Sequence, residues 1–157
     1  MKKYYFLLTT VLITTGLIII SSFRPNSEPE ILKMVNNIRA NGCNCGNEYM
    51  PAVKPLRWNN RLAAAAKTQS DYMHRVRRMT HTGNRGNTAG NRINKTGYRY
   101  SYYAENIAIG QATAREVMSS WMSSPGHCKN IMSRYATEMG ASKTGKYWVQ
   151  VFTKPLK

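Results

Sequence analysis

The sequence predicts an α+β fold, because helical periodicity dominates about the first three quarters of its 157 residues and strand alternation dominates its end. Three segments before residue 123 repeat apolar residues every three or four positions, which is typical of helices that bury one face. Near the carboxyl terminus, Trp148, Gln150 and Phe152 alternate with the residues between them. Helices followed by strands favour helices packed against an antiparallel sheet.

The amino terminus predicts export. Lys2 and Lys3 precede Tyr4–Ile20, an uncharged apolar run that small polar residues follow. This order is typical of a secretory signal peptide, which we assign to residues 1–23. The alternative is an uncleaved membrane anchor, because the run is close to the lower limit of about 17 residues for a spanning helix. In both cases we expect an extracytoplasmic protein, whether secreted, periplasmic or anchored through residues 4–20.

Charge is the strongest departure from average composition. The chain has 23 basic and 7 acidic residues, for a net charge of +16, to which Lys2 and Lys3 contribute two units. Such a field concentrates anionic partners near the surface, and for an exported protein we expect envelope polysaccharide or lipid. Nucleic acid is not an expected partner, because the basic residues lack the interleaved aromatic residues of a single-strand binding groove.

Three cysteines, Cys43, Cys45 and Cys128, agree with an oxidising compartment. Cys43 and Cys45 are too close in sequence to bridge each other easily, so we expect Cys128 to pair with one of them and leave one free thiol. A bridge to Cys45 would close a loop of about 80 residues and contribute about 4.5 kcal/mol. No metal site is expected on the cysteines, because neither a C-x-x-C pair nor a zinc-finger spacing is present.

A short linker and helix cap, residues 24–30, leads into the domain, residues 31–157. In the predicted capping box Ser27 accepts a backbone hydrogen bond, Glu30 reaches back, and Pro29 lies in the first turn. The apolar residues that follow at helical spacing are Ile31, Met34, Val35 and Ile38. Gly42 is the expected end of this helix. The next stretch, with two prolines and the cysteine pair, is expected to be an irregular loop.

Asn59 is the predicted cap of a second, longer helix. Its expected inward face consists of Leu62, Ala65, Ala66, Gln69, Tyr72, Met73 and Val76. The run Ala63–Ala66 would let another element approach closely, and Thr80–Gly83 is expected to end the helix. Residues 83–97 are rich in Gly, Asn and Thr and are expected to form a loop.

A second capping box, Thr113 with Glu116, predicts a third helix. Its expected inward residues are Ala114, Val117, Met118, Trp121 and Met122. Ser124 as cap and Pro125 at the first position then predict a short helix whose first turn carries His127 and Cys128. Two strands, 139–142 and 147–153, are expected on either side of a turn at residues 143–145.

Six short segments follow one another in a distinctive order: Pro55–Asn59, His81–Gly83, Ala104–Ala108, Trp121–His127, Glu138–Gly140 and Tyr147–Phe152. Together they resemble the CAP superfamily, also called the SCP/PR-1-like or cysteine-rich secretory protein family. The Ser-Pro-Gly-His form of the fourth segment resembles the bacterial branch of that family. The Cys45-Gly46 and His127-Cys128 pairs resemble a bacterial subgroup with two bonded cysteines, which favours a Cys45–Cys128 disulfide, with Cys43 as the alternative partner.

The resemblance implies an α-β-α sandwich with a small antiparallel sheet between helices and an open cleft on one face. In many relatives the cleft presents two His and two Glu, which in some bind a divalent metal. His81, Glu105 and His127 match three of these residues, so they are the candidate ligands for zinc or another divalent metal. Ser124 stands where eukaryotic relatives carry the remaining Glu, and Glu138 is the only acidic residue downstream. The expected cleft residues are therefore His81, Glu105, Asn106, Ser124, His127 and Glu138.

The chemistry of these residues agrees with a polar site. His127, in the first turn of a helix, would be held neutral by the positive end of the helix dipole, as a metal ligand or general base requires. Glu105 lies among apolar residues, so its carboxylate needs an imidazolium, a metal or backbone amides as a partner. The alternative is that a His–Glu pair only ties loops together through hydrogen bonds.

We therefore expect a binding domain with a polar His/Glu cleft, for an envelope-associated or lipid-like ligand, since the family includes lipid- and sterol-binding members. The alternative is a zinc-dependent hydrolase in the envelope or outside the cell, because two His and one Glu leave a fourth position for water. His81, Glu105 and His127 are then the candidates for catalysis. No serine or cysteine nucleophile stands in a recognised elbow, and HExxH is absent from the sequence.

Overall fold

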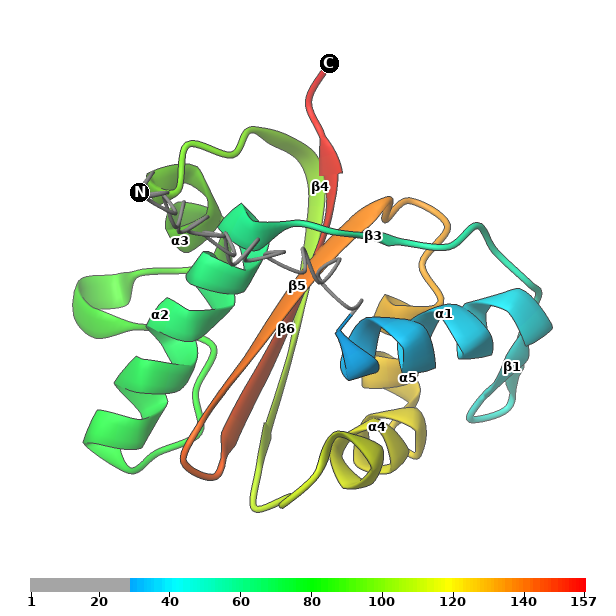
Figure 1. The fold of residues 1–157 in the computed structure, drawn as a ribbon, viewed down its shortest axis with the longest axis horizontal. Coiled ribbons are helices and arrows are strands. Elements are labelled where there is room, and N and C mark those ends of the chain that lie inside the picture. Colours follow the sequence, from blue (N-terminus) through cyan, green and yellow to red (C-terminus); the bar gives the residue numbers. More distant parts are fainter. Residues whose placement is uncertain (1–28) are drawn as a thin grey trace, which may run out of the picture.

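A four-stranded sheet lies between two groups of helices in the computed structural model, which describes residues 29–157 (Figure 1). The predicted signal segment and the predicted Ser27 cap lie outside the described residues. In chain order the helices and strands are α1 (Glu30–Asn41), β1 (Cys43–Cys45), β2 (Glu48–Met50), β3 (Arg57–Trp58), α2 (Asn60–Val76), a 3-10 turn (Asn84–Gly86), α3 (Ala89–Lys95), β4 (Tyr100–Ile109), α4 (Ala114–Met122), α5 (Pro125–Ile131), β5 (Glu138–Thr144) and β6 (Tyr147–Pro155).

The strands of the main sheet lie in the order β3-β5-β6-β4. β5 pairs antiparallel with β6, and β6 pairs antiparallel with β4 along almost their whole length. The short β3 pairs parallel with β5, with Arg57 beside Glu138, so the expected antiparallel sheet has one parallel edge. The α+β sandwich is confirmed, and β4 forms the long outer edge of its sheet.

Both faces of the sheet are buried, as the alternation along β6 shows. Trp148 and Phe152 join a core with α1, α4 and α5, while Tyr147, Val149 and Val151 join a second core with α2 and α3. The helices accordingly lie on opposite sides of the sheet in Figure 1. A strand that buries both faces loses the usual apolar–polar alternation, and β6 is apolar from Tyr147 to Phe152 apart from the buried Gln150.

Helix α2 packs closely on the sheet. The Asn59 side chain caps it by accepting a hydrogen bond from the Arg61 amide. A Cβ atom at Gly140 of β5 would collide with the backbone around Ala63, which confirms the close approach expected of the alanine run. The helix ends at Val76 because Arg77 adopts a left-handed conformation with φ 53°. Val76 is 40% exposed, so its assignment to the inward face was wrong.

Two expected loops contain regular structure. Residues 83–97 include α3, whose cap is Thr88. The Thr88 hydroxyl accepts a hydrogen bond from the Asn91 amide. The stretch after Gly42 includes the hairpin β1–β2. The sequence pattern missed both because each element is shorter than the window that periodicity needs.

Helices α4 and α5 begin where the sequence predicts. Thr113 accepts from the Glu116 amide, and Glu116 accepts from the Ala112 amide, which confirms the capping box. Ser124 precedes Pro125 at the start of α5, but its side chain makes no capping hydrogen bond. At α1, Pro29 occupies the cap position rather than the first turn, and Gly42 ends the helix with φ 69°.

Arg39 of α1 is a charged side chain in the interior and is only 1% exposed. Its guanidinium donates to the carbonyls of Lys54, Ile131, Ser133 and Ala136. Burial lowers its pKa to about 10, although Tyr102 partly offsets this effect. Because Ile131 ends α5, the cation lies at the negative end of that helix and joins α1 to it.

No helix within residues 29–157 is both long enough and apolar enough to cross a membrane.

Candidate functional site

The candidate site lies at the outer edge of the sheet, on β4. Glu105 and Asn106 are neighbours on this strand, so their side chains point to opposite faces of the sheet. Glu105 is turned toward the layer of α2 and α3, where it meets His81 and Arg92. Asn106 is turned toward α5, where it meets His127. Because β4 is an edge strand, groups from both helical layers can reach the same edge.

Glu105 is a buried carboxylate with two partners. One oxygen, Oε1, lies 2.9 Å from His81 Nδ1, and the other accepts from the Arg92 guanidinium. The Glu105 side chain is 3% exposed and that of Arg92 is 1% exposed, whereas that of His81 is 57% exposed. Arg92 neutralises the carboxylate in the interior, and the carboxylate orients an imidazole that faces solvent. With Nδ1 engaged, Nε2 is the ring nitrogen of His81 left for a ligand.

Arg92 also fixes the loop that carries His81. Its guanidinium donates to the carbonyls of His81 and Asn87. A cavity of about 280 Å³ adjoins it, lined also by Gln69, Gly83 and Asn87. Arg92 Nε, Gln69 Oε1 and Asn87 Oδ1 are buried without a hydrogen-bond partner in the described part of the chain. Arg92 is therefore one of the buried groups that hold the loop around His81, together with Gln69, which donates to the Thr80 carbonyl.

His127 reaches the edge from the other layer. Asn106 donates to the His127 carbonyl at 3.1 Å and accepts from Asn130 at 2.9 Å, so β4 fixes the first turn of α5. Burial lowers the pKa of His127, and the charge of His81 lowers it further. His127 is therefore neutral at neutral pH.

The predicted metal ligands His81, His127 and Glu105 thus gather at one edge, but not as a three-ligand cluster. Within residues 29–157, the only group of three His, Cys, Asp or Glu residues with ligand atoms within 4.8 Å of one another is Cys43, Cys45 and Cys128. The Glu105 oxygens are engaged by His81 and Arg92, so the carboxylate supports His81 instead of pointing at a shared metal position. His81 Nε2 and the His127 ring are the nitrogens that remain.

Glu138 and Ser124 have other surroundings than the two histidines. Glu138 accepts hydrogen bonds from Arg57 at 2.8 Å, Asn59 at 2.7 Å and Tyr98 at 2.9 Å. Burial alone would raise its pKa, but these hydrogen bonds outweigh it and hold the pKa below its usual value. The carboxylate is therefore saturated by the chain itself. Ser124 occupies the cap position of α5, three residues before His127.

The sequence patterns gave Arg92 no role beyond a charge in a loop. Its partner in the site, Glu105, was expected to need an imidazolium, a metal or amides, so a guanidinium was not considered. A usable signal was present, since Thr88 can cap a helix that would carry Arg92.

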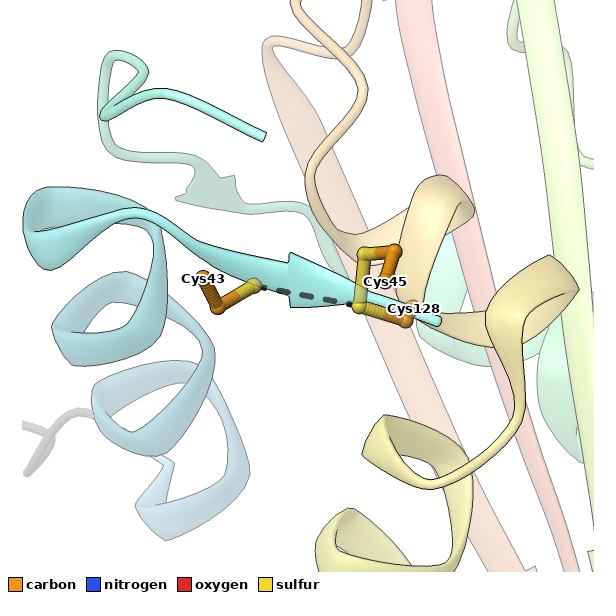
Figure 2. Close-up of side chains that lie close together, drawn as sticks. All are labelled: Cys43, Cys45 and Cys128. Carbon is orange, nitrogen blue, oxygen red and sulfur yellow. Dashed lines mark hydrogen bonds between the residues drawn. A yellow bond between two sulfur atoms is a disulfide. The ribbon is translucent and has the colours of Figure 1, made fainter. Parts of the chain in front are cut away.

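The cysteines form a second cluster, away from β4. Cys45 and Cys128 form a disulfide, as the resemblance favours, and Cys43 is free. Figure 2 shows the Cys43 sulfur beside this disulfide, 3.8 Å from the sulfur of Cys128. Burial raises the pKa of the Cys43 thiol. With two of the three sulfurs joined covalently, one thiol remains as a ligand.

Comparison with known proteins identifies the relatives of this chain. The family model described as the cysteine-rich secretory protein family, CAP, matches residues 32–152. The uncharacterized protein YkwD of Bacillus subtilis (strain 168) is 32% identical over 102 residues, which cover 64% of this chain and 40% of that protein. The uncharacterized membrane protein YlbC of the same organism is 24% identical over 128 residues, covering 82% of this chain and 34% of that protein.

Solved structures share the fold. An extracellular protein containing a SCP domain from Bacillus anthracis superposes with a TM-score of 0.70 at 24% identity, over 79% of this chain and 39% of that one. An outer surface protein of Borrelia burgdorferi superposes with a TM-score of 0.68 at 20% identity, over 80% of this chain and 90% of that one. The chain spans about 40% or less of the curated Bacillus subtilis relatives, so their further parts have no counterpart in these matches.

Proposed function

The chain belongs to the CAP family of cysteine-rich secretory proteins, and on that premise we propose that it is an exported domain that binds an envelope-associated or lipid-like ligand. The ligand's polar head would lie against His81 and His127 at the β4 edge. The observation that carries this proposal is the buried Arg92–Glu105 pair, which orients a half-exposed imidazole. A salt bridge that served the fold alone would not need an exposed histidine on its outer side.

The surroundings of the two histidines support an amphipathic ligand. Tyr103 lies two positions before Glu105 on β4, hence on the same face, and is 41% exposed. It packs edge-on against Tyr100, with ring centroids 5.0 Å apart, which gives the edge an apolar surface beside its polar one. The net charge of +16 would draw acidic head groups or acidic glycans to the domain.

The test measures binding to vesicles of anionic phospholipid, to neutral vesicles and to an acidic polysaccharide. We expect His81→Ala and His127→Ala to weaken binding of the preferred partner. His74→Ala is the matched control, because His74 is an exposed histidine that packs near Tyr147 on another part of the surface. Equal binding by all three variants and the unaltered protein would contradict a ligand site at the β4 edge.

Salt separates general attraction from the site. Retention through the basic surface should weaken steeply as salt rises, because exposed charges are screened over about 8 Å at physiological ionic strength. Equal retention at low and high salt would show that charge is not its cause. Duplex DNA under the same conditions measures the general polyanion effect.

A metal-dependent hydrolase is the second candidate, favoured by the lowered pKa of His127, which leaves this imidazole unprotonated at neutral pH and able to ligate. Zinc would polarise a carbonyl or a bound water. Titration calorimetry on tag-free protein should then show a 1:1 site that both His81→Ala and His127→Ala abolish and that weakens below about pH 6.5. Absence of zinc uptake at neutral pH would reject this candidate. Activity on peptide, ester or glycan substrates that disappears with the same substitutions would support it.

A further inference from the structure

The free thiol of Cys43 lies in contact with the disulfide of the same domain. Its sulfur is 3.8 Å from Cys128 Sγ, and all three sulfurs lie within 4.8 Å of one another (Figure 2). Cys45 is 1% exposed and Cys128 is fully buried, whereas Cys43 is partly exposed. A thiol with access to solvent therefore touches a disulfide that has almost none.

Strand geometry explains why two cysteines compete for one partner. Cys43 and Cys45 are two positions apart on β1, so their side chains point to the same face, toward α5. Within the described residues, β1 pairs only with β2 and is not part of the main sheet. The hairpin is held against α5 by the disulfide, by contact of Gly46 with Pro125 and by a surface ion pair of Glu48 with Lys129. A slip of β1 by two residues would present Cys43 to Cys128 in place of Cys45.

We propose that Cys43, Cys45 and Cys128 form a thiol–disulfide exchange site, in which Cys43 displaces Cys45 from Cys128. The Cys43 thiol loses its proton to solvent, and its sulfur forms a bond to Cys128 Sγ. The Cys45–Cys128 bond breaks, and its electron pair leaves on Cys45, which then takes up a proton. One disulfide and one thiol are present before and after the step, so no oxidant or reductant is consumed.

The exchange needs the Cys43 side chain to rotate and the β1–β2 hairpin to slip. Attack runs along the axis of the S–S bond, and an in-line approach would place the sulfurs of Cys43 and Cys45 further apart than 4.8 Å. The Cys43 sulfur now lies beside the bond. Rotation of the Cys43 side chain, together with the slip of the hairpin, brings it into line. The protein therefore alternates between two disulfide isomers that share Cys128.

The test must distinguish two cysteines on one peptide. Trypsin leaves Cys43 and Cys45 together in residues 40–57, since Pro55 blocks cleavage after Lys54, and it leaves Cys128 in residues 116–129. Fragmentation between Cys43 and Cys45 is therefore needed to locate each label. The folded protein is incubated, alkylated with N-ethylmaleimide and then digested without reduction. We expect label on Cys45 in a fraction of chains, with Cys128 then linked to Cys43. The Cys43→Ser variant should lose all label at Cys45, because its disulfide cannot move.

The Cys45→Ser variant isolates the second isomer. If it folds in the presence of air or oxidised glutathione, which accepts the two electrons, we expect its mass to lack two hydrogens and its Cys43 to be linked to Cys128. Free Cys43 and Cys128 thiols in a folded Cys45→Ser protein would overturn the proposal. If that variant does not fold, the unaltered protein decides alone, and label confined to Cys43 overturns the proposal. Label on Cys45 that persists in Cys43→Ser also overturns it, because the disulfide is then opened from outside.

Discussion

Glu105 and Glu138 are two buried carboxylates on one sheet, each bound to an arginine. They differ in their other hydrogen-bond partners. Glu138 is saturated by Arg57, Asn59 and Tyr98. Glu105 is bound by the buried Arg92 on one side and by a half-exposed imidazole on the other. The first arrangement closes a structural network. In the second, a carboxylate held by a buried arginine orients a histidine at the surface. This difference separates a structural carboxylate from one that organises a site.

The largest expected effect is that of Arg92→Met. Removing the guanidinium leaves the Glu105 carboxylate buried without its main counter-charge, so the free energy of unfolding should fall by about 3–5 kcal/mol. Arg57→Met is the matched control and should cost less than about 1 kcal/mol, because the Arg57 side chain is 76% exposed. Denaturant unfolding measures both. Equal losses of stability would show that Glu105 does not depend on Arg92 more than Glu138 depends on Arg57.

Glu138→Gln should cost about 1–3 kcal/mol at neutral pH, because the amide cannot accept all three hydrogen bonds. Its pKa is lower folded than unfolded, so the ionised carboxylate stabilises the fold above about pH 4.3. That contribution is lost as pH falls through the lowered pKa. A plot of the free energy of unfolding against pH should therefore be flatter between pH 6 and pH 2 for the variant than for the unaltered protein. Parallel curves would show that Glu138 is not the group that titrates.

The lowered pKa of His127 predicts a smaller effect of pH on stability, at a higher pH than the effect of Glu138. Burial, then the charge of His81, lowers its pKa, so the unfolded chain binds more protons between that pKa and about 6.5. Stability should rise with pH through this window, and His127→Gln should remove the rise. His81→Ala should move the NMR titration of His127 upward. A His127 titration that is unchanged in His81→Ala would mean that the two rings do not interact.

The smallest expected effect on stability is that of His81→Ala, below about 1 kcal/mol, because the imidazole is 57% exposed and water can replace it on Glu105. Ligand binding at the β4 edge should nevertheless be lost. A loss of stability as large as that of Arg92→Met would instead place His81 among the structural groups. Thermal unfolding and vesicle binding on the same preparation decide this.

The sequence predicted the parts of the fold that depend on local signals. Helix starts and ends are set by interactions within a few residues. The starts at Asn59 and at Thr113 with Glu116, and the end at Gly42, are where they were expected. The alternation along β6 was also local, although the burial of both faces depended on helices far along the chain. Short elements such as α3 and the β1–β2 hairpin were missed because they hold too few residues to show a period.

The sequence selected candidate residues for a site but could not predict their connections. Motif matches selected His81, Glu105 and His127, which the fold gathers at β4. The partner of Glu105 is set by where α3 lies on the sheet, and a sequence pattern carries no such information. Glu138 illustrates the reverse case, since its three donors come from β3, the cap of α2 and the segment before β4. Only the assembled sheet shows that this carboxylate is already satisfied.

The buried Arg39 has a consequence for the order in which the chain assembles. Its carbonyl partners include Ile131, Ser133 and Ala136, which lie 92 to 97 residues further along the chain. The guanidinium cannot leave water favourably until those carbonyls are in place, because a buried cation without partners costs several kcal/mol. Helix α1 is the first segment of the domain in sequence, and we expect it to be among the last to dock. Closing so long a loop is slow, so the domain should fold only after almost all of its chain is available.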